Sequence, residues 1–227
     1  YKDTLSDKFL FLNFEILDLN KGLEGKNRLI ESLKILSDKI KKLELKNDRI
    51  VIEIVESNVK NLEDLKFFTD LCKSLGFLVA LDDVGSGHSN LNRIPLLKPD
   101  IIKIDRYLIQ DIDKDYHKQE VFKSITGLSR VIGTLIVAEG VETQKEAILS
   151  IELRADFIQG FYFSEPKQVF CQDIEEKIND LYAEFKKYFQ EKTLRKKSKN
   201  RILLKIIKDL SRELELIFYN EGISKDA

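Results

Sequence analysis

Six short apolar runs in this sequence are each followed directly by a polar or ionisable residue. The residues at these positions are Asn13, Glu53, Asp82 with Asp83, Lys103, Glu139 and Gln159. If the runs are parallel strands of one barrel, their carboxyl ends meet at one mouth, where such barrels build their active sites. Four of the side chains are carboxylates. Two of these at 4 Å repel by about 1 kcal/mol in water and about 4 kcal/mol at an effective dielectric of 20. We therefore expect them to share protons or to bind cations.

The types of these residues restrict the chemistry further. Oxygen ligands without Cys or His favour Mg²⁺, Mn²⁺ or Ca²⁺ over Zn²⁺. The adjacent Asp82 and Asp83 suit a two-metal site, because one carboxylate can bridge both ions while the other holds one. Two-metal sites serve in-line attack on phosphate esters. Lys103 would add a cation that orients the attacking water or neutralises a phosphate oxygen. The residues alone thus predict metal-dependent hydrolysis of a phosphate ester.

Each of these residues also has a purely structural interpretation. Asp-Asp before Gly is common in turns and caps, a Glu after a strand often serves the amino end of a helix, and Lys103 could simply pair with a carboxylate. His88 is interpreted as a loop residue and His117 as an exposed helix residue. The coincidence of polar residues at six successive strand ends favours a site.

The elements that must position these residues follow from the hydropathy pattern. The apolar runs are continuous rather than alternating, which is typical of strands buried on both faces of a parallel sheet. Between them, apolar residues recur every three or four positions within 29–43, 62–75 and 121–132, which predicts helices with one face toward a core. The expected core face of the last helix is Val121, Ile125, Leu128 and Ile132. Repeated strand–helix units predict an α/β fold, either a (β/α) barrel or a doubly wound sheet.

Composition sets the class of protein. The chain has 227 residues, of which 43% are hydrophobic and 34% charged, as in soluble globular proteins. A net charge of -1 argues against a protein that mainly coats nucleic acid, and no DNA partner is expected. Two separated cysteines, Cys72 and Cys171, indicate a reducing compartment. No apolar run approaches the ~20 residues that span a bilayer. We therefore expect a cytoplasmic protein.

The character of the chain changes after Pro166. Apolar residues at helical spacing surround a basic run at 195–199, and the next glycine is Gly222. We expect a barrel domain over 1–166 and a helical extension or linker over 167–227. The basic run is interpreted as a solvated helix face, with contact to an anionic surface as the alternative. The apolar stripes could be a dimerisation surface or the entry to a further domain.

Longer motifs resemble the EAL family of bacterial phosphodiesterases, which open cyclic di-GMP to linear pGpG. Residues 81–91 (LDDVGSGHSNL) are similar to the signature loop of that family. Residues 103–105 (KID), 137–143 (VAEGVET) and 159–161 (QGF) match further family motifs in the same order. The resemblance covers roughly residues 9–166, and it implies a modified TIM (β/α)8 barrel that hydrolyses cyclic di-GMP.

The resemblance also implies roles for individual residues. The implied metal ligands, which would hold two Mg²⁺ or Mn²⁺ ions with Asp82 as the bridge, are Asn13, Glu53, Asp82, Asp83 and Glu139. Lys103 matches a lysine beside the catalytic water, Gln159 a site glutamine near that water, and Glu56 a glutamate that braces the signature loop. By the same resemblance we expect a homodimer and additional sensory domains.

Three features depart from the family pattern. Val55 replaces Thr in the Glu-x-Thr-Glu segment, and Glu15 replaces Ser in the Asn-x-Ser segment. The Glu-Ala-Leu motif, whose glutamate is a ligand on the first barrel strand, has no match in residues 1–12. The sequence contains no Met and begins at Tyr1, so either its start or its methionines are absent. We expect the first strand to exist upstream of Tyr1.

Two alternatives to the phosphodiesterase stay open at this point. The first is a degenerate, non-catalytic EAL-like module that binds cyclic di-GMP or a protein partner and signals through its carboxyl-terminal helices. The second is another metal-dependent barrel hydrolase that acts on a different phosphate ester. Cleavage assays with cyclic di-GMP and with a panel of phosphate esters would separate them.

Overall fold

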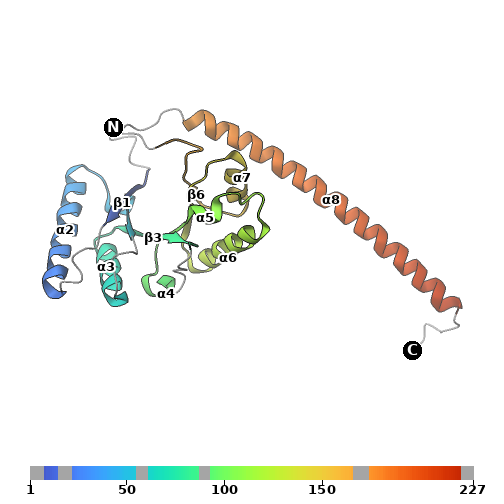
Figure 1. Ribbon diagram of the computed structural model, residues 1–227, viewed down its shortest axis with the longest axis horizontal. Helices are drawn as coiled ribbons and strands as arrows, with labels where there is room; N and C mark the ends of the chain where they lie inside the picture. The colour runs from blue at the N-terminus through green and yellow to red at the C-terminus, as the bar shows by residue number, and fades with distance from the viewer. Residues whose placement is uncertain (1–7, 15–21, 55–60, 87–92, 166–173, 221–227) are drawn as a thin grey trace. The chain divides into compact units, whose positions relative to one another are not determined.

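The computed structural model describes residues 8–14, 22–54, 61–86, 93–165 and 174–220. Within the last segment it describes side chains up to Lys196 and at Lys199. The chain divides into two compact units, Tyr1–Cys171 (unit 1) and Gln172–Ala227 (unit 2). Unit 1 contains the strands and helices from β1 to β6 in chain order, and unit 2 contains α8 (Figure 1).

Unit 1 is built on a sheet of six parallel strands in the order β1-β2-β3-β4-β5-β6. Their bounds are Leu10–Phe14, Ile50–Ile54, Leu78–Val84, Ile101–Ile104, Leu135–Ala138 and Phe157–Ile158. Each expected strand is confirmed. Because the order in the sheet follows the order in the chain, the fold is barrel-like, whereas a doubly wound sheet reverses its order at a switch point.

The sheet forms a half-barrel. Phe9, next to β1, packs edge to face against Phe157 of β6, with ring centroids 6.0 Å apart. The first and last strands of the sheet therefore approach each other on one face, as they do where parallel strands begin to close a barrel. The α/β class and the TIM-barrel-like architecture predicted from the sequence are confirmed.

Helices connect the strands. The longer ones in unit 1 are α2 (Gly22–Lys42), α3 (Leu62–Ser74), α6 (Tyr116–Ile132) and α7 (Gln144–Glu152). The short ones are the 3-10 turn η2 (Asn47–Arg49), α4 (Ile94–Leu97) and α5 (Arg106–Ile109). Helix α3 begins where the Asn61 side chain accepts a hydrogen bond from the Glu63 N–H, and it ends before Gly76, whose φ is +84°. Such a left-handed residue after a helix is the conformation that glycine adopts most readily.

The predicted core face of α6 was wrong. Of the stripe Val121, Ile125, Leu128 and Ile132, only Ile125 is buried. The buried face is Phe122, Ile125, Thr126 and Ser129. The two polar members can be buried because their hydroxyls bond within the helix: Thr126 Oγ1 donates to the Lys123 carbonyl and Ser129 Oγ to the Thr126 carbonyl.

One face of the sheet carries an apolar layer beneath the strand ends. Val51, Ala80, Ile101 and Val137 are buried together, with Phe9, Phe11 and Leu78 packed against them. Successive side chains of a strand point to opposite faces, so residues two positions further along each strand lie on the same face as this layer. The layer therefore supports whatever side chains occupy the strand ends.

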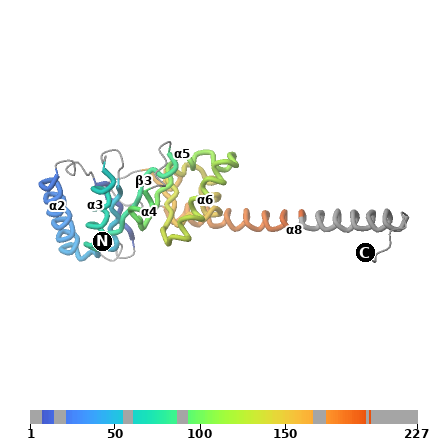
Figure 2. Tube along the Cα trace, turned by 90° about the horizontal axis from the view of Figure 1, so that it is seen from below, coloured from blue at the N-terminus to red at the C-terminus, as the bar shows by residue number. Residues whose placement is uncertain are grey.

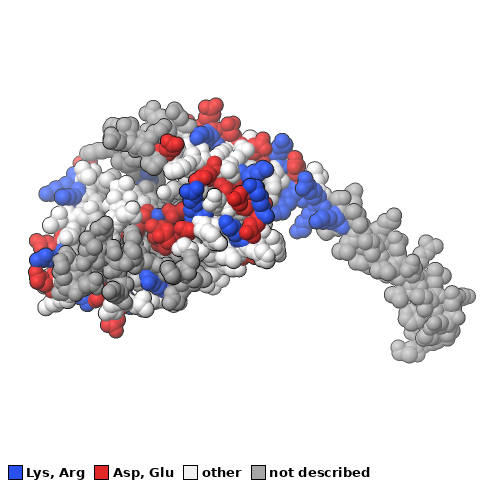
Figure 3. All heavy atoms as spheres, in the orientation of Figure 1, with Lys and Arg blue, Asp and Glu red and all other residues white. Residues whose placement is uncertain are grey.

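Unit 2 consists of one helix, α8, that runs from Ile174 to Asn220 (Figure 2). Basic side chains gather on its described part, as Figure 3 shows. In the part of the chain that the structure describes, no helix combines the length and the apolar character needed to cross a bilayer. The assignment of 1–166 and 167–227 as separate domains stays a prediction.

Candidate metal centre

Strand pairing and the alternation of side chains bring the predicted site residues to one face of the sheet. Asn13 on β1 lies opposite Glu53 on β2, and Glu53 lies opposite Ala80 on β3. Lys103 on β4 lies opposite Val137 on β5. Asp82 and Glu139 come two residues after Ala80 and Val137. The period of two therefore places them on the same face, one layer above the apolar layer.

A β-bulge at the end of β3 brings in a second aspartate. Leu81 pairs with Ile102 and Val84 pairs with Ile104, so two residues, Asp82 and Asp83, lie opposite Lys103 alone. Asp83 has a left-handed backbone with φ of +54°, and its N–H donates to Asp82 Oδ1 at 3.0 Å. Adjacent residues of a regular strand point to opposite faces. The bulge changes the direction of Asp83, so that it can lie on the same face as Asp82, as bulges next to active sites often do.

Lys103 lies at the centre of the cluster and is almost fully buried, at 4% exposed. Its Nζ is 2.7 Å from Glu139 Oε1, 2.9 Å from Glu53 Oε2 and 3.1 Å from Asp82 Oδ1. These carboxylates come from three different strand ends, so a single ammonium group holds them together. Burial opposes the charge on Lys103, but its contacts with Glu139, Asp82 and Glu53 outweigh burial and raise its pKa.

One ammonium group cannot neutralise all the carboxylates around it. Burial raises the pKa of Glu139 to about 7, and the neighbouring Asp82 and Glu53 charges add to the increase despite the contact with Lys103. Burial, followed by the charges of Asp82 and Asp105, also raises the pKa of Asp83. The cluster therefore carries an excess of negative charge that favours either a proton or a further cation.

The donor set fits a divalent ion. Asp82, Asp83 and Glu139 each offer a carboxylate oxygen, and these oxygens all lie within 4.8 Å of one another. Carboxylate oxygens are the ligands that Mg²⁺, Mn²⁺ and Ca²⁺ prefer. Glu53 belongs to the same cluster, because its carboxylate also contacts Lys103 Nζ. The geometry thus groups four of the predicted ligands at one site.

The other predicted residues lie at the edge of this cluster or outside the described residues. Asn13 is exposed and opposite Glu53. Gln159 is also exposed; its N–H donates to the Ala138 carbonyl and its carbonyl accepts from the Val141 N–H, which joins it to the segment after β5. Glu56, which was predicted to brace the signature loop, lies outside the described residues, as do Glu15, Val55 and His88. His117 is an exposed residue of α6.

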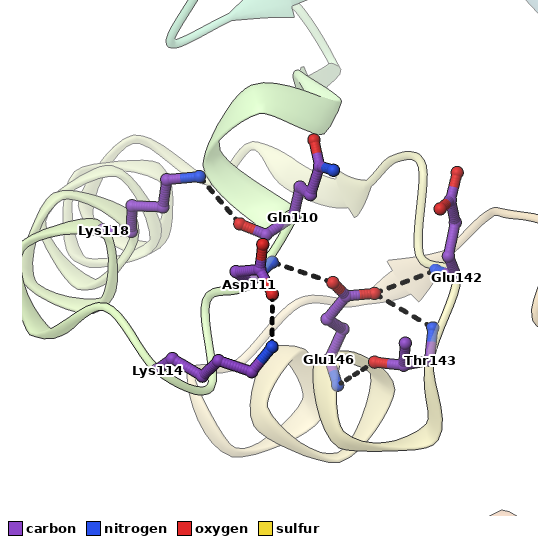
Figure 4. A network of polar contacts seen from close by, with 7 residues as sticks. All are labelled: Gln110, Asp111, Lys114, Lys118, Glu142, Thr143 and Glu146. Carbon is purple, nitrogen blue, oxygen red and sulfur yellow. Dashed lines mark hydrogen bonds and ion pairs between the residues drawn. The ribbon is translucent and has the colours of Figure 1, made fainter.

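Sequence reasoning assigned no role to several polar residues in the segments that follow the site strands. Asp105 caps α5, because its side chain accepts from the Tyr107 N–H at 2.7 Å, and it contributes to the raised pKa of Asp83. Arg106 pairs with Glu142 at 2.7 Å. Glu146 accepts three backbone hydrogen bonds (Figure 4). The Thr143-x-x-Glu146 spacing, a capping-box signal, could have identified Glu146 from the sequence.

Comparisons with known proteins agree with this geometry. The family model described as "EAL domain" matches residues 27–166. The chain is 31% identical over 128 residues to the probable cyclic di-GMP phosphodiesterase PdeA of Escherichia coli, covering 56% of this chain and 18% of that protein. It is 35% identical over 136 residues to the cyclic di-GMP phosphodiesterase PdeA of Borreliella burgdorferi, covering 59% and 20%.

Comparison with solved structures also finds similarity to proteins that were solved with cyclic di-GMP. The Bacillus subtilis YkuI protein, which has an EAL domain and was solved with cyclic di-GMP and calcium, matches with a TM-score of 0.69 and 25% identity, over 84% of this chain and 47% of that one. Klebsiella pneumoniae BlrP1, solved with manganese and cyclic di-GMP, matches with a TM-score of 0.61 and 28% identity, over 70% and 39%. The chain spans about a fifth of the length of the two curated relatives.

Proposed function

The chain belongs to the EAL domain family, and from this premise we propose that it hydrolyses cyclic di-GMP to linear pGpG with two divalent ions, Mg²⁺ or Mn²⁺. The observation that carries the proposal is the cluster of carboxylates from separate strand ends around the buried Lys103. The two curated relatives are named as a phosphodiesterase and a probable phosphodiesterase for this dinucleotide, and both solved relatives contain it.

The residues that would hold the ions are Asn13, Glu53, Asp82, Asp83 and Glu139, with Asp82 as the proposed shared ligand. When bound, a pair of divalent ions lowers the pKa of water and stabilises the attacking and leaving oxygens of a phosphate ester during in-line displacement. The excess negative charge of the cluster supports this assignment, since burial, together with neighbouring negative charges, raises the pKa of both Glu139 and Asp83.

Lys103 has a separate proposed role. Its ammonium donates to Glu139 and Glu53 and lies beside Asp82, so it fixes the orientation of these carboxylates before substrate arrives. Held charged in a buried position, it is suited to orient the attacking water or to neutralise a phosphate oxygen of the substrate. Gln159 follows β6 at the edge of the site, where its exposed amide can hydrogen-bond the same water or the substrate.

The test is to incubate the full-length protein with cyclic di-GMP and Mg²⁺ or Mn²⁺ and to measure pGpG by chromatography. We expect turnover by the unchanged protein and a loss of at least about 100-fold in Asp82→Asn, because the substitution removes the charge of the bridging ligand. Asp70→Asn is the matched control: Asp70 is an exposed residue of α3 that pairs with Lys66.

The outcomes distinguish the functions. Binding of cyclic di-GMP without cleavage by a folded, metal-loaded protein would favour the non-catalytic module. Cleavage of another phosphate ester but not of cyclic di-GMP would favour a different hydrolase. Equal activity of Asp82→Asn and Asp70→Asn would contradict the assigned site.

Three further predictions extend this proposal beyond unit 1. We expect the protein to act in the cytoplasm, to form a homodimer and to work together with sensory domains. Fractionation of cells, light scattering of the purified protein and the sequence of the full gene would check these in turn.

A further inference from the structure

Glu146 lies behind the metal centre, on α7. It is buried, at 4% exposed, yet its carboxylate accepts three backbone hydrogen bonds (Figure 4). Oε2 accepts from the N–H groups of Glu142 and Thr143, both at 3.0 Å. Oε1 accepts from the N–H of Asp111 at 2.9 Å, and Asp111 lies 35 positions earlier in the chain. One side chain therefore connects the segment after β5 to the turn after α5.

The two connected segments follow the two strands that carry the centre of the site. Lys103 lies in β4, which leads into α5 and the turn at Asp111, and Glu139 directly follows β5 and leads into the segment at Glu142. Other contacts join the same two segments. The Glu139 N–H donates to the Ile104 carbonyl at 3.1 Å, and Arg106 pairs with Glu142 at 2.7 Å. Among these contacts, those of Glu146 come from a buried carboxylate and extend to Asp111, beyond α5.

Helix capping explains only part of this arrangement. Thr143 and Glu146 form a capping box at the start of α7, in which the Glu146 N–H donates to Thr143 Oγ1 and the Thr143 N–H donates to Glu146 Oε2. A capping box needs one acceptor atom at this position, and Gln provides it as well as Glu. The second oxygen is directed to Asp111, a non-glycine residue in a left-handed conformation with φ of +58°. Such a conformation is uncommon and is retained when surrounding contacts hold it.

We propose that Glu146 is a positioning residue for the metal centre: by joining the Asp111 turn to the Glu142–Thr143 segment, it fixes Glu139 relative to Lys103. This inference rests on the proposed function, because it takes Glu139 to be a ligand of a divalent ion. Groups behind the ligands of a metal site typically change metal affinity by 10–100-fold when they are lost. Glu146 would act through the backbone of the segment that carries the ligand.

Glu146→Gln tests this directly in the full-length protein. One amide oxygen can still accept from the Glu142 and Thr143 N–H groups and keep the capping box, whereas the amide NH₂ cannot accept from the Asp111 N–H. We expect the amide hydrogen of Asp111 to exchange faster with solvent, and the dissociation constant for Mn²⁺, measured by calorimetry without cyclic di-GMP, to rise roughly 10-fold. The variant should still unfold cooperatively.

Thr143→Ala is the matched control. It removes the hydroxyl that caps α7 but leaves both Glu146 oxygens and the contact to Asp111 in place. If Glu146 acts only as a helix cap, Glu146→Gln keeps that cap and should leave stability, Mn²⁺ affinity and the exchange at Asp111 unchanged. If it positions the site, Thr143→Ala should lose stability while its Mn²⁺ affinity and the exchange at Asp111 stay the same.

The outcomes separate this inference from the function on which it rests. If the unchanged protein does not bind Mn²⁺, the proposed function fails and the inference fails with it. If the unchanged protein binds Mn²⁺ and folded Glu146→Gln binds it equally well, only the inference is overturned. If Glu146→Gln does not fold, Glu146→Asp keeps the charge but shortens the side chain by one methylene; the same loss of affinity is then expected, and unchanged affinity overturns the proposal.

Discussion

At the residue scale, the chemistry of the centre depends on how carboxylates from three strand ends share the ammonium of Lys103. The contacts of Lys103 with Glu139, Glu53 and Asp82 are all 3.1 Å or shorter. Even so, the pKa of Glu139 is raised to about 7, because burial disfavours its charge and its neighbours are also negative. Glu139 therefore changes between its protonated and ionised forms near neutral pH.

The raised pKa of Glu139 in the folded chain predicts how the stability of the protein depends on pH. The folded chain keeps a proton on Glu139 that the unfolded chain loses above its ordinary pKa, so without metal the contribution of Glu139 to stability falls as pH rises through about 7. Asp83 shifts in the same direction. In the presence of a chelator, we expect the melting temperature to be higher at pH 6 than at pH 8, by roughly 2–4 °C. Calorimetric scans would measure it.

Metal should reverse this trend, because a carboxylate must be ionised to bind an ion. Added Mn²⁺ should raise the melting temperature more at pH 8 than at pH 6. Glu139→Gln has no proton to lose at this position, so it should show little of the pH dependence seen in chelator. If the melting temperature in chelator depends on pH in the same way for the unchanged protein and for Glu139→Gln, the explanation is refuted.

The sequence was sufficient to predict that Glu53, Asp82, Lys103 and Glu139 lie together, but it did not contain their geometry. Hydropathy places Glu53, Asp82, Lys103 and Glu139 at strand ends, and parallel strands place such ends together. The sequence gives no local signal for the bulge that directs Asp83 to the same site, since a run such as Leu78–Val84 pairs regularly or irregularly depending on its neighbour. The capping-box spacing identifies Glu146 at the start of α7, but it gives no sign of the hydrogen bond to Asp111, which is distant in sequence.

At the element scale, the turn after β6 is held against the segment after β5 by backbone contacts. The Val141 N–H donates to the Gln159 carbonyl at 3.1 Å, and the Val141 carbonyl accepts from the Tyr162 N–H at 3.0 Å. Gly160 lies between these bonds. A Cβ on Gly160 would be 2.1 Å from the Val141 oxygen and 2.3 Å from its nitrogen. The backbone of the Glu139 segment therefore leaves no space for a side chain here.

Gly160→Ala should therefore push the two segments apart. We expect a loss of about 2 kcal/mol in the free energy of unfolding, as for other overpacked sites, together with weaker Mn²⁺ binding because Glu139 shifts with Val141. Gly127→Ala in α6 is the matched control: a Cβ there meets no atom within 4 Å, and it should stabilise the helix by about 0.5–1 kcal/mol. Urea unfolding of both variants would measure this, and equal stabilities would contradict the packing argument.

The error over α6 shows what periodicity alone cannot decide. Two stripes on this helix, displaced by about one position, both have helical spacing, and the more apolar of the two was predicted to face the core. The structure buries the other one, because Thr126 and Ser129 satisfy their hydroxyls within the helix. Hydropathy counts those hydroxyls as unfavourable in a core, although here they are already paired.

At the scale of the whole molecule, the burial of the other stripe of α6 leaves apolar side chains exposed on the surface of unit 1. Val121, Leu128, Val131 and Ile132 are exposed on α6, Val131 to 86%, and Leu135 at the start of β5 is exposed beside them in sequence. Contiguous exposed apolar side chains often mark an interface with another protein. This surface is where the expected homodimer would most readily form.

Replacing two of these residues tests that expectation. We expect light scattering to give the mass of a dimer for the unchanged protein and of a monomer for the double variant Leu128→Glu with Val131→Glu. Exposed positions tolerate such changes, so the stability of each subunit should change by less than about 0.5 kcal/mol. Leu23→Glu on α2, where Leu23 is 77% exposed, is the control and should leave the mass unchanged. The same mass for all three proteins would rule out this surface as the interface.

The bulge in β3 has a consequence for how a chain of this kind can lose the proposed activity. Two residues of β3 occupy the space that regular pairing gives to one, so deletion of Asp83 would let β3 and β4 align without interruption. The sheet would become more regular while the centre lost a carboxylate. Regular pairing of β3 with β4 and a second carboxylate at the site therefore exclude each other at this position. A related chain that lost this one residue could still fold well and yet be inactive.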